Sequence, residues 1–172
     1  MKLMIKLAES NDCAAISRLA GETFCLACPE NCDKTEMENY IAVHLSENAF
    51  RQMLDSNNLV IIAKQQNGIA GMMVLIPSEE SLPEIASVPA MQVQKLYVST
   101  DYHGVGVASE LINRMVELTR EHGYRKAWLT VFSGNKRAIR FYEKMGFITI
   151  GTTEFHMGNE VHLDNLMALD II

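Results

Sequence analysis

Two closely spaced glycines, Gly104 and Gly106, follow a β-branched run that ends at Val98 and precede an amphipathic stretch. Glycines in such a turn let backbone N–H groups point to one spot, and a helix N-terminus adds partial positive charge there, so the pattern is suited to holding a phosphate. Ser109 replaces the third glycine of a dinucleotide-binding G-x-G-x-x-G motif, and no P-loop motif is present. A plain strand-to-helix turn is the alternative interpretation.

Four cysteines, Cys13, Cys25, Cys28 and Cys32, lie in the first fifth of the chain. The spacing of the last three is compatible with metal binding. It is a single cluster without a histidine close by in the sequence, so we expect free thiols and no metal. The N-terminus lacks the pattern of a signal peptide, which predicts a cytoplasmic protein.

Composition limits the class of protein. With 172 residues, of which 48% are hydrophobic, the chain is expected to form one domain over residues 1–172. No apolar run is long enough for a membrane span. The net charge of −6 is unlike that of a typical nucleic-acid binder. We therefore expect neither a membrane nor a nucleic-acid partner.

Hydrophobic periodicity predicts five helices and seven strands. One helix is expected to begin at a capping box formed by Thr35 and Glu38, and another at Ser46. Asn67-Gly68 is a hairpin signal, and 77–89 is expected to be a loop. The remaining helices are expected at 12–24, 106–122 and 136–145, and the strands at 4–8, 59–63, 69–76, 91–98, 127–132, 147–155 and 161–169.

The order of these elements predicts the topology. The strands on either side of the 106–122 helix must be parallel and joined by a right-handed crossover, whereas the hairpins are antiparallel. The fold class is therefore α/β (α+β). We expect a mixed, mostly antiparallel sheet of six to seven strands, with a central parallel pair and helices on both faces.

Two segments resemble the GNAT superfamily of N-acetyltransferases. The run from His103 to Ala108 resembles the family's Q/R-x-x-G-x-G/A pyrophosphate loop. Asn135 to Phe147 resembles its N-x-x-A-x-x-[FL]-Y-x-K-x-G-F segment nearly position for position. Both motifs occur in the family's order, and the sharp part of the match spans 91–147. The resemblance implies the GNAT fold and acetyl-CoA (coenzyme A) as cofactor.

The closing segment from Phe155 to Glu160, with Asp164 and Met167, is similar to that of bacterial spermidine/spermine N-acetyltransferases of the PaiA type. This resemblance implies attack of a primary amine on the acetyl thioester, with a polyamine such as spermidine or spermine as acceptor. A protein N-terminus, an amino acid or an aminoglycoside is an alternative acceptor, and a non-catalytic acyl-CoA-binding domain is an alternative function. Because relatives often dimerise, a homodimer is also possible.

The resemblance also implies roles for individual residues. Tyr142 is expected to protonate the departing thiolate. The reference pKa is about 8.5 for the thiol and about 10 for tyrosine, so a nearby tyrosine hydroxyl carries a proton that it can donate. A backbone N–H at or near Val98 would stabilise the oxyanion. The alternatives are a core aromatic for Tyr142, a helix N-cap for Asn135 and an exposed histidine for His103. The expected cofactor contacts are Leu96, Tyr97, Val98, His103, Gly104, Val105, Gly106, Val107, Ala108, Ser109, Asn135, Ala138, Tyr142 and Lys144.

The acceptor side is less defined by the resemblance. Many relatives carry a glutamate base on the central strand, where this chain has Gln92 and Gln94. A water chain could replace that base, as could Glu22, Glu36, His44 or Glu160. The residues expected at the acceptor site are Phe24, Glu36, Tyr40 and Glu160.

Overall fold

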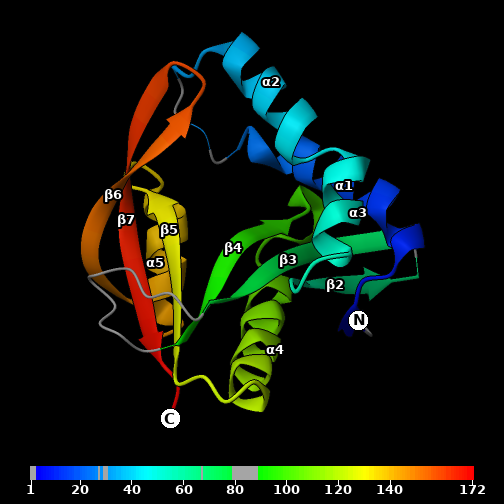
Figure 1. The fold of residues 1–172 in the computed structure, drawn as a ribbon, viewed down its shortest axis with the longest axis vertical. Helices are drawn as coiled ribbons and strands as arrows, with labels where there is room; N and C mark the ends of the chain where they lie inside the picture. The colour runs from blue at the N-terminus through cyan, green and yellow to red at the C-terminus, as the bar shows by residue number, and fades with distance from the viewer. Residues whose placement is uncertain (1–2, 27, 29–30, 67, 79–88) are drawn as a thin grey trace.

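The computed structural model describes residues 3–26, 28, 31–66, 68–78 and 89–172, and shows a twisted sheet with helices packed on it (Figure 1). Asn67 of the hairpin signal and most of the 77–89 loop lie outside the described residues. The strands are β1 (Met4–Leu7), β2 (Leu59–Gln65), β3 (Gly68–Ser78), β4 (Ala90–Val98), β5 (Lys126–Phe132), β6 (Ile148–Met157) and β7 (Glu160–Asp170). The helices are α1 (Cys13–Phe24), α2 (Lys34–His44), α3 (Glu47–Leu54), α4 (Val107–Glu121) and α5 (Lys136–Lys144), with short 3-10 turns at Ser10–Asp12 and Thr100–Tyr102.

The sheet has the order β1-β2-β3-β4-β5-β7-β6. Its one parallel pair is β4 with β5, and the other pairs in the sheet are antiparallel. The mixed sheet with a central parallel pair is therefore confirmed. In the part of the chain that the structure describes, no helix is long and apolar enough to cross a membrane.

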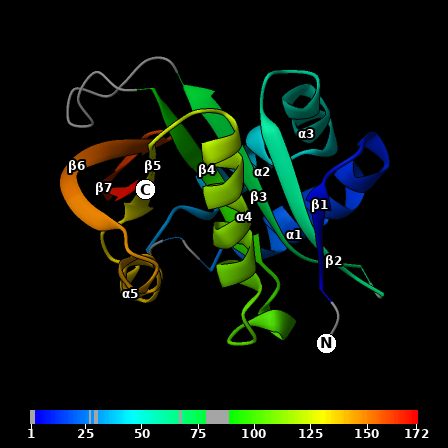
Figure 2. The same ribbon diagram turned by 90° about the horizontal axis from the view of Figure 1, so that it is seen from below.

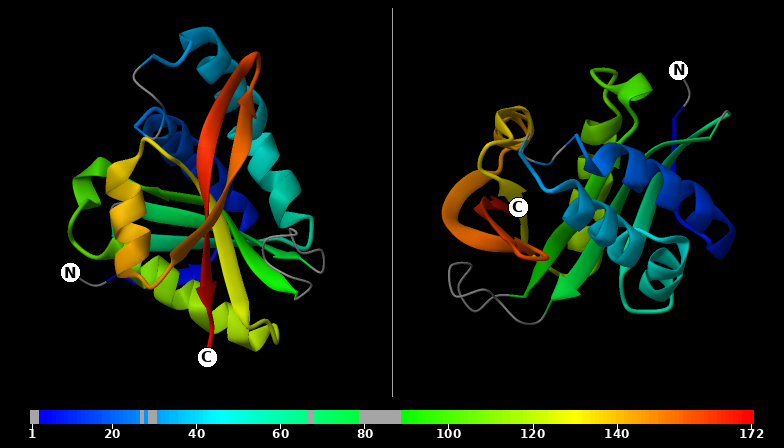
Figure 3. Two further views of the ribbon diagram at one scale, coloured as in Figure 1. Left: turned by 90° about the vertical axis from the view of Figure 1, so that its left-hand side faces the viewer. Right: turned by 90° about the horizontal axis from the view of Figure 1, so that it is seen from above.

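Helices cover both faces of the sheet, as expected. Alternate residues of β2 and β3 point to opposite faces. Ile61 and Met73 pack into a core beneath α4, whereas Ile62 and Met72 pack into a second core beneath α1 and α3. Figures 1 and 2 show α4 on one face and α1 with α3 on the other. The turn between β6 and β7 reaches α2, so it lies beside the helices of the second core (Figures 1 and 3).

The central parallel pair opens along its length. β4 and β5 are paired at Met91 with Ala127 and at Gln92 with Trp128. Beyond Gln92, a bulge on β4 shifts its register with β3, and bulges bend the strand that carries them. Among the described residues, the edge of β4 that faces β5 has no strand partner after Gln92. The fold thus leaves a wedge between the two strands, at their carboxyl ends.

Side-chain caps fix where the helices begin. The Ser46 hydroxyl accepts a hydrogen bond from Ala49 N–H, which confirms the predicted cap. The predicted capping box at Thr35 is wrong, because the cap of α2 lies two residues earlier, at Asp33. The Asp33 carboxylate accepts the N–H groups of Thr35 and Glu36. An extended backbone at Asp33 places this carboxylate over the first turn, which the sequence pattern of the box did not reveal.

Candidate active site

Two cavities meet at the wedge between β4 and β5. The first, which we call the loop cavity, has a volume of about 590 Å³ and lies between the segment Tyr102–Ser109 and α5. The second, which we call the aromatic cavity, has a volume of about 210 Å³ and is lined by Phe24, Tyr40 and Phe155 among others. Five residues line both cavities, so the two spaces are continuous there: Leu96, Tyr97, Asn135, Ala138 and Tyr142.

The glycine turn has the backbone that a phosphate site needs. Gly104 and Gly106 have φ angles of 79° and 94°, in the left-handed region that disfavours side chains. Gly106 is the N-cap of α4, which has no side-chain cap, and the first backbone bond of the helix runs from Glu110 N–H to the Gly106 carbonyl. The N–H groups at 107–109 precede that bond, so they are available to an anion in the loop cavity.

Other predicted cofactor residues divide into two groups. Val98, Val107, Ala108, Ser109 and Lys144 line the loop cavity, whereas Val105 is 54% exposed and does not. His103 also lines this cavity, but its Nε2 is 3.0 Å from the Val98 carbonyl oxygen, so the ring ties the turn to the end of β4. Arg137 lines it too and was missed, although its charge in the first turn of α5 was a usable signal.

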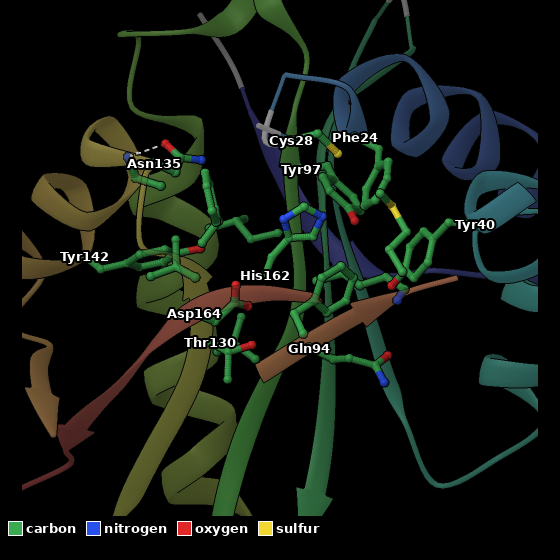
Figure 4. Close-up of a pocket in the computed structure, with 18 residues that line it drawn as sticks. Phe24, Cys28, Tyr40, Gln94, Tyr97, Thr130, Asn135, Tyr142, His162 and Asp164 are labelled. Carbon is green, nitrogen blue, oxygen red and sulfur yellow. Dashed lines mark hydrogen bonds between the residues drawn. The ribbon is translucent and has the colours of Figure 1, made fainter. Parts of the chain in front are cut away.

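Asn135 and Tyr142 stand where the cavities join. The Asn135 side chain accepts the N–H of Ala138, so it caps α5, as its alternative interpretation held, while also lining both cavities. The Tyr142 hydroxyl points into the aromatic cavity (Figure 4). Its ring packs edge-on against Phe147, and burial raises the pKa of its hydroxyl. Tyr142 therefore keeps its proton at neutral pH, and it lines both cavities.

Three aromatic rings from different elements form one wall of the aromatic cavity. Phe24 and Tyr40 are stacked with centroids 4.7 Å apart, and Phe155 meets Tyr40 edge-on at 5.6 Å. Phe24 and Tyr40 are thus brought together, as the sequence predicted. Such rings attract a cation through their π faces.

Asp164 on β7 was missed as a site residue. Its carboxyl group lines the aromatic cavity and is 7% exposed (Figure 4). Burial raises its pKa, against the lowering effects of a hydrogen bond from Thr130 and of the His162 ring. Among the described lining residues, Asp164 is the only carboxylate. The sequence could have indicated this position, because Asp164 stands two residues before the buried Leu166 and so lies on the same face of the strand.

Lys95 on β4 was also missed. It lines the aromatic cavity and is 8% exposed, and burial lowers its pKa to about 8. Within the described ranges, no carboxylate forms an ion pair with it. At neutral pH this lysine therefore carries a positive charge that burial disfavours.

Glu36 and Glu160, both expected at the acceptor site, do not line either cavity. The Glu36 carboxylate accepts hydrogen bonds from the backbone and side chain of Asn159. Glu160 accepts from the Cys32 thiol and from Asp33 N–H. Both carboxylates thus hold the start of α2 on the β6–β7 turn. Of the other proposed bases, His44 packs on the Tyr40 ring and Glu22 is exposed.

Comparisons with known proteins identify the family and agree with the fold. Residues 24–147 match the model of the acetyltransferase (GNAT) family. An uncharacterized N-acetyltransferase of Mycobacterium tuberculosis is 29% identical over 162 residues, covering 94% of this chain and 99% of that protein. The PaiA N-acetyltransferase of Thermoplasma acidophilum, solved with coenzyme A, superposes with a TM-score of 0.74 at 15% identity, over 99% of both chains. The ribosomal-protein-S18-alanine N-acetyltransferase of Escherichia coli superposes with a TM-score of 0.71 at 19% identity, over 99% of this chain and 94% of that one.

Proposed function

The chain belongs to the GNAT acetyltransferase family and is an acetyl-CoA-dependent N-acetyltransferase, and on this premise we propose that it acetylates a polyamine such as spermidine or spermine. The observation that carries this proposal is the aromatic cavity. It combines one buried carboxylate, Asp164, with three aromatic rings, and it shares Tyr142 with the loop cavity.

We place the cofactor in the loop cavity. The N–H groups between Gly104 and Ser109 would hold its diphosphate, with the positive charges of Arg137 and Lys144 nearby. The pantetheine arm would then pair with Leu96–Val98, because β5 has moved away from this edge of β4. This arrangement would bring the acetyl group to the junction of the two cavities.

The reaction itself needs few groups. The neutral amine attacks the acetyl carbonyl carbon, the nitrogen of the tetrahedral adduct loses a proton to water, and the adduct then expels the thiolate to leave an amide. An N–H of β4 at or near Val98 would stabilise the oxyanion of the adduct. Tyr142 would give its proton to the sulfur as the thiolate departs, and water would return a proton to the tyrosine afterwards.

The acceptor would enter through the aromatic cavity. Asp164 would attract one ammonium group, and the Phe24 and Tyr40 rings would contact the alkyl chain and its charge, each cation–π contact contributing about 0.5–2 kcal/mol. The positive charge of Lys95 in the same cavity would favour the neutral form of the amine that attacks. A second ammonium group bound by Asp164 would make a polyamine a better acceptor than a monoamine.

Thiol release from acetyl-CoA tests the proposal. Spermidine and spermine would be compared with lysine, an aminoglycoside and a peptide that begins with alanine. We expect the polyamines to give the highest kcat/KM. If another amine is acetylated while spermidine is not, the polyamine proposal is refuted. Tight acetyl-CoA binding without turnover on any amine would favour the non-catalytic alternative. The cytoplasmic location and the homodimer stay predictions.

A further inference from the structure

A cysteine, a glutamate and a histidine meet beside the aromatic cavity. The Cys32 thiol, a Glu160 carboxylate oxygen and a His162 ring nitrogen all lie within 4.8 Å of one another. Cys32 comes from the segment before α2, whereas Glu160 and His162 come from β7. We propose that these three side chains bind a zinc ion. The site is independent of the acetyl-transfer chemistry proposed above.

The distances between the donor atoms suit a tetrahedral ion. Cys32 Sγ is 3.3 Å from Glu160 Oε2, and His162 Nε2 is 3.5 Å from the same oxygen. With bonds of about 2.3 Å to sulfur and 2.0–2.1 Å to nitrogen and oxygen, a tetrahedral zinc separates such donors by about 3.3–3.6 Å. The third pair, Cys32 Sγ and His162 Nε2, lies within 4.8 Å, so an ion at the centre would draw these two side chains together.

His162 supplies a second observation that points to a ligand. Its Nε2 is buried and makes no hydrogen bond among the described residues; Glu160 Oε2, 3.5 Å away, pairs with it only when the ring is protonated. A buried ring nitrogen without a partner is costly, and most are satisfied in folded proteins. A metal bound at Nε2 would satisfy it.

Cys28 offers a fourth ligand. Its thiol interacts with that of Cys32, and it lines the aromatic cavity together with His162 (Figure 4), although it lies outside the three donors that are within 4.8 Å of one another. Judged by sequence spacing alone, this cysteine pair lacked a nearby histidine. The fold supplies that histidine from β7, about 130 residues further along the chain, so the missing ligand type is present in space.

The types of donor atom indicate which metal ion would bind. Sulfur, nitrogen and carboxylate oxygen together suit zinc, whereas magnesium and calcium prefer oxygen alone. On binding, zinc replaces the proton of each ligating thiol, and those protons leave to solvent without any change of oxidation state. Because Glu160 also accepts the N–H of Asp33, the cap of α2, the ion would fix the start of α2 on β7 beside the aromatic cavity.

Titration of the reduced, metal-free protein with cobalt(II) tests the site. Cobalt occupies zinc sites and reports thiolate ligands by a charge-transfer band and tetrahedral geometry by its visible bands. We expect saturation at about one equivalent, and displacement by zinc. Cys32→Ala and His162→Asn should each weaken binding by about 100-fold or more, since even groups behind the ligands contribute 10–100-fold.

Cys25→Ala is the matched control, because Cys25 is an exposed cysteine of the same segment outside the cluster. It should bind cobalt like the parent protein. Zinc should also raise the melting temperature of the parent and of Cys25→Ala, but not that of His162→Asn. Coenzyme A binding shows whether each variant is folded. If Cys32→Ala does not fold, Cys32→Ser is tested in its place. No saturable binding, or binding that survives in both cluster variants, would refute the site.

Discussion

Replacing Gly106 by alanine should weaken coenzyme A binding, because the turn needs a left-handed backbone that alanine disfavours. Gly106 has a φ of 94°, and a Cβ built there meets no heavy atom within 4 Å. The substitution therefore causes no clash, and its cost is the left-handed backbone, about 1–2 kcal/mol. The turn can relieve that strain only by rotating its N–H groups away from the direction in which we expect the diphosphate.

The magnitude follows from that strain. Coenzyme A would have to restore the strained backbone on binding, so the loss of affinity is bounded by the same 1–2 kcal/mol, or about 5- to 30-fold in Kd. Gly123, just beyond the other end of α4, is the matched control. Its φ is 77° and a Cβ there also meets nothing within 4 Å, but it lines neither cavity.

Calorimetric titration with coenzyme A and chemical unfolding would be applied to both variants. We expect Gly106→Ala and Gly123→Ala to lose similar unfolding free energy, while only the first loses affinity. Equal Kd values for the two variants, at equal loss of stability, would refute the assignment of the turn to the diphosphate.

Three further outcomes are expected. Tyr142→Phe should lower kcat about 10- to 100-fold with an unchanged Kd for acetyl-CoA, because it removes the proposed acid; an unchanged kcat would exclude Tyr142 from the chemistry. Asp164→Asn should raise the KM for spermidine at least about tenfold, by removing a buried charge partner, while a monoamine is affected less; equal effects on both amines would contradict this role. Burial lowers the pKa of Lys95 from 10.5 to about 8. Below pH 8 this shift lowers the free energy of unfolding by about 3 kcal/mol, and the free energy is regained as the pH rises from 8 to 10.5. Lys95→Met should therefore be more stable at pH 7 and lose that rise in stability, and urea unfolding across this pH range would show whether it does.

Periodicity and turn residues were enough to predict the order of elements along the chain and the central parallel pair, but not that β7 lies between β5 and β6. The apolar run of β2, the hairpin signal before β3 and the helical period of α4 are local patterns, and the crossover rule then predicts the parallel pair. The cap of α2 was predicted wrongly, because Thr35 and Asp33 are both good caps and the choice depends on how the chain enters the helix.

The candidate site was predictable where its residues lie close together in the sequence. The turn from Gly104 to Ser109 is one such segment, and the segment after Asn135 is another. Asp164, Lys95 and His162 were missed because their environment is created by strands that meet only in the folded sheet. An acid or a histidine on a strand has no local sign of burial, so its role follows from neighbours distant in the sequence.

A crystal structure of the complex with coenzyme A would test the central claim most directly. It should show diphosphate oxygens within hydrogen-bonding distance of N–H groups between Gly104 and Ser109, the pantetheine arm along Leu96–Val98, and the sulfur beside the Tyr142 hydroxyl. A nucleotide bound outside the loop cavity, or a sulfur remote from Tyr142, would contradict the account.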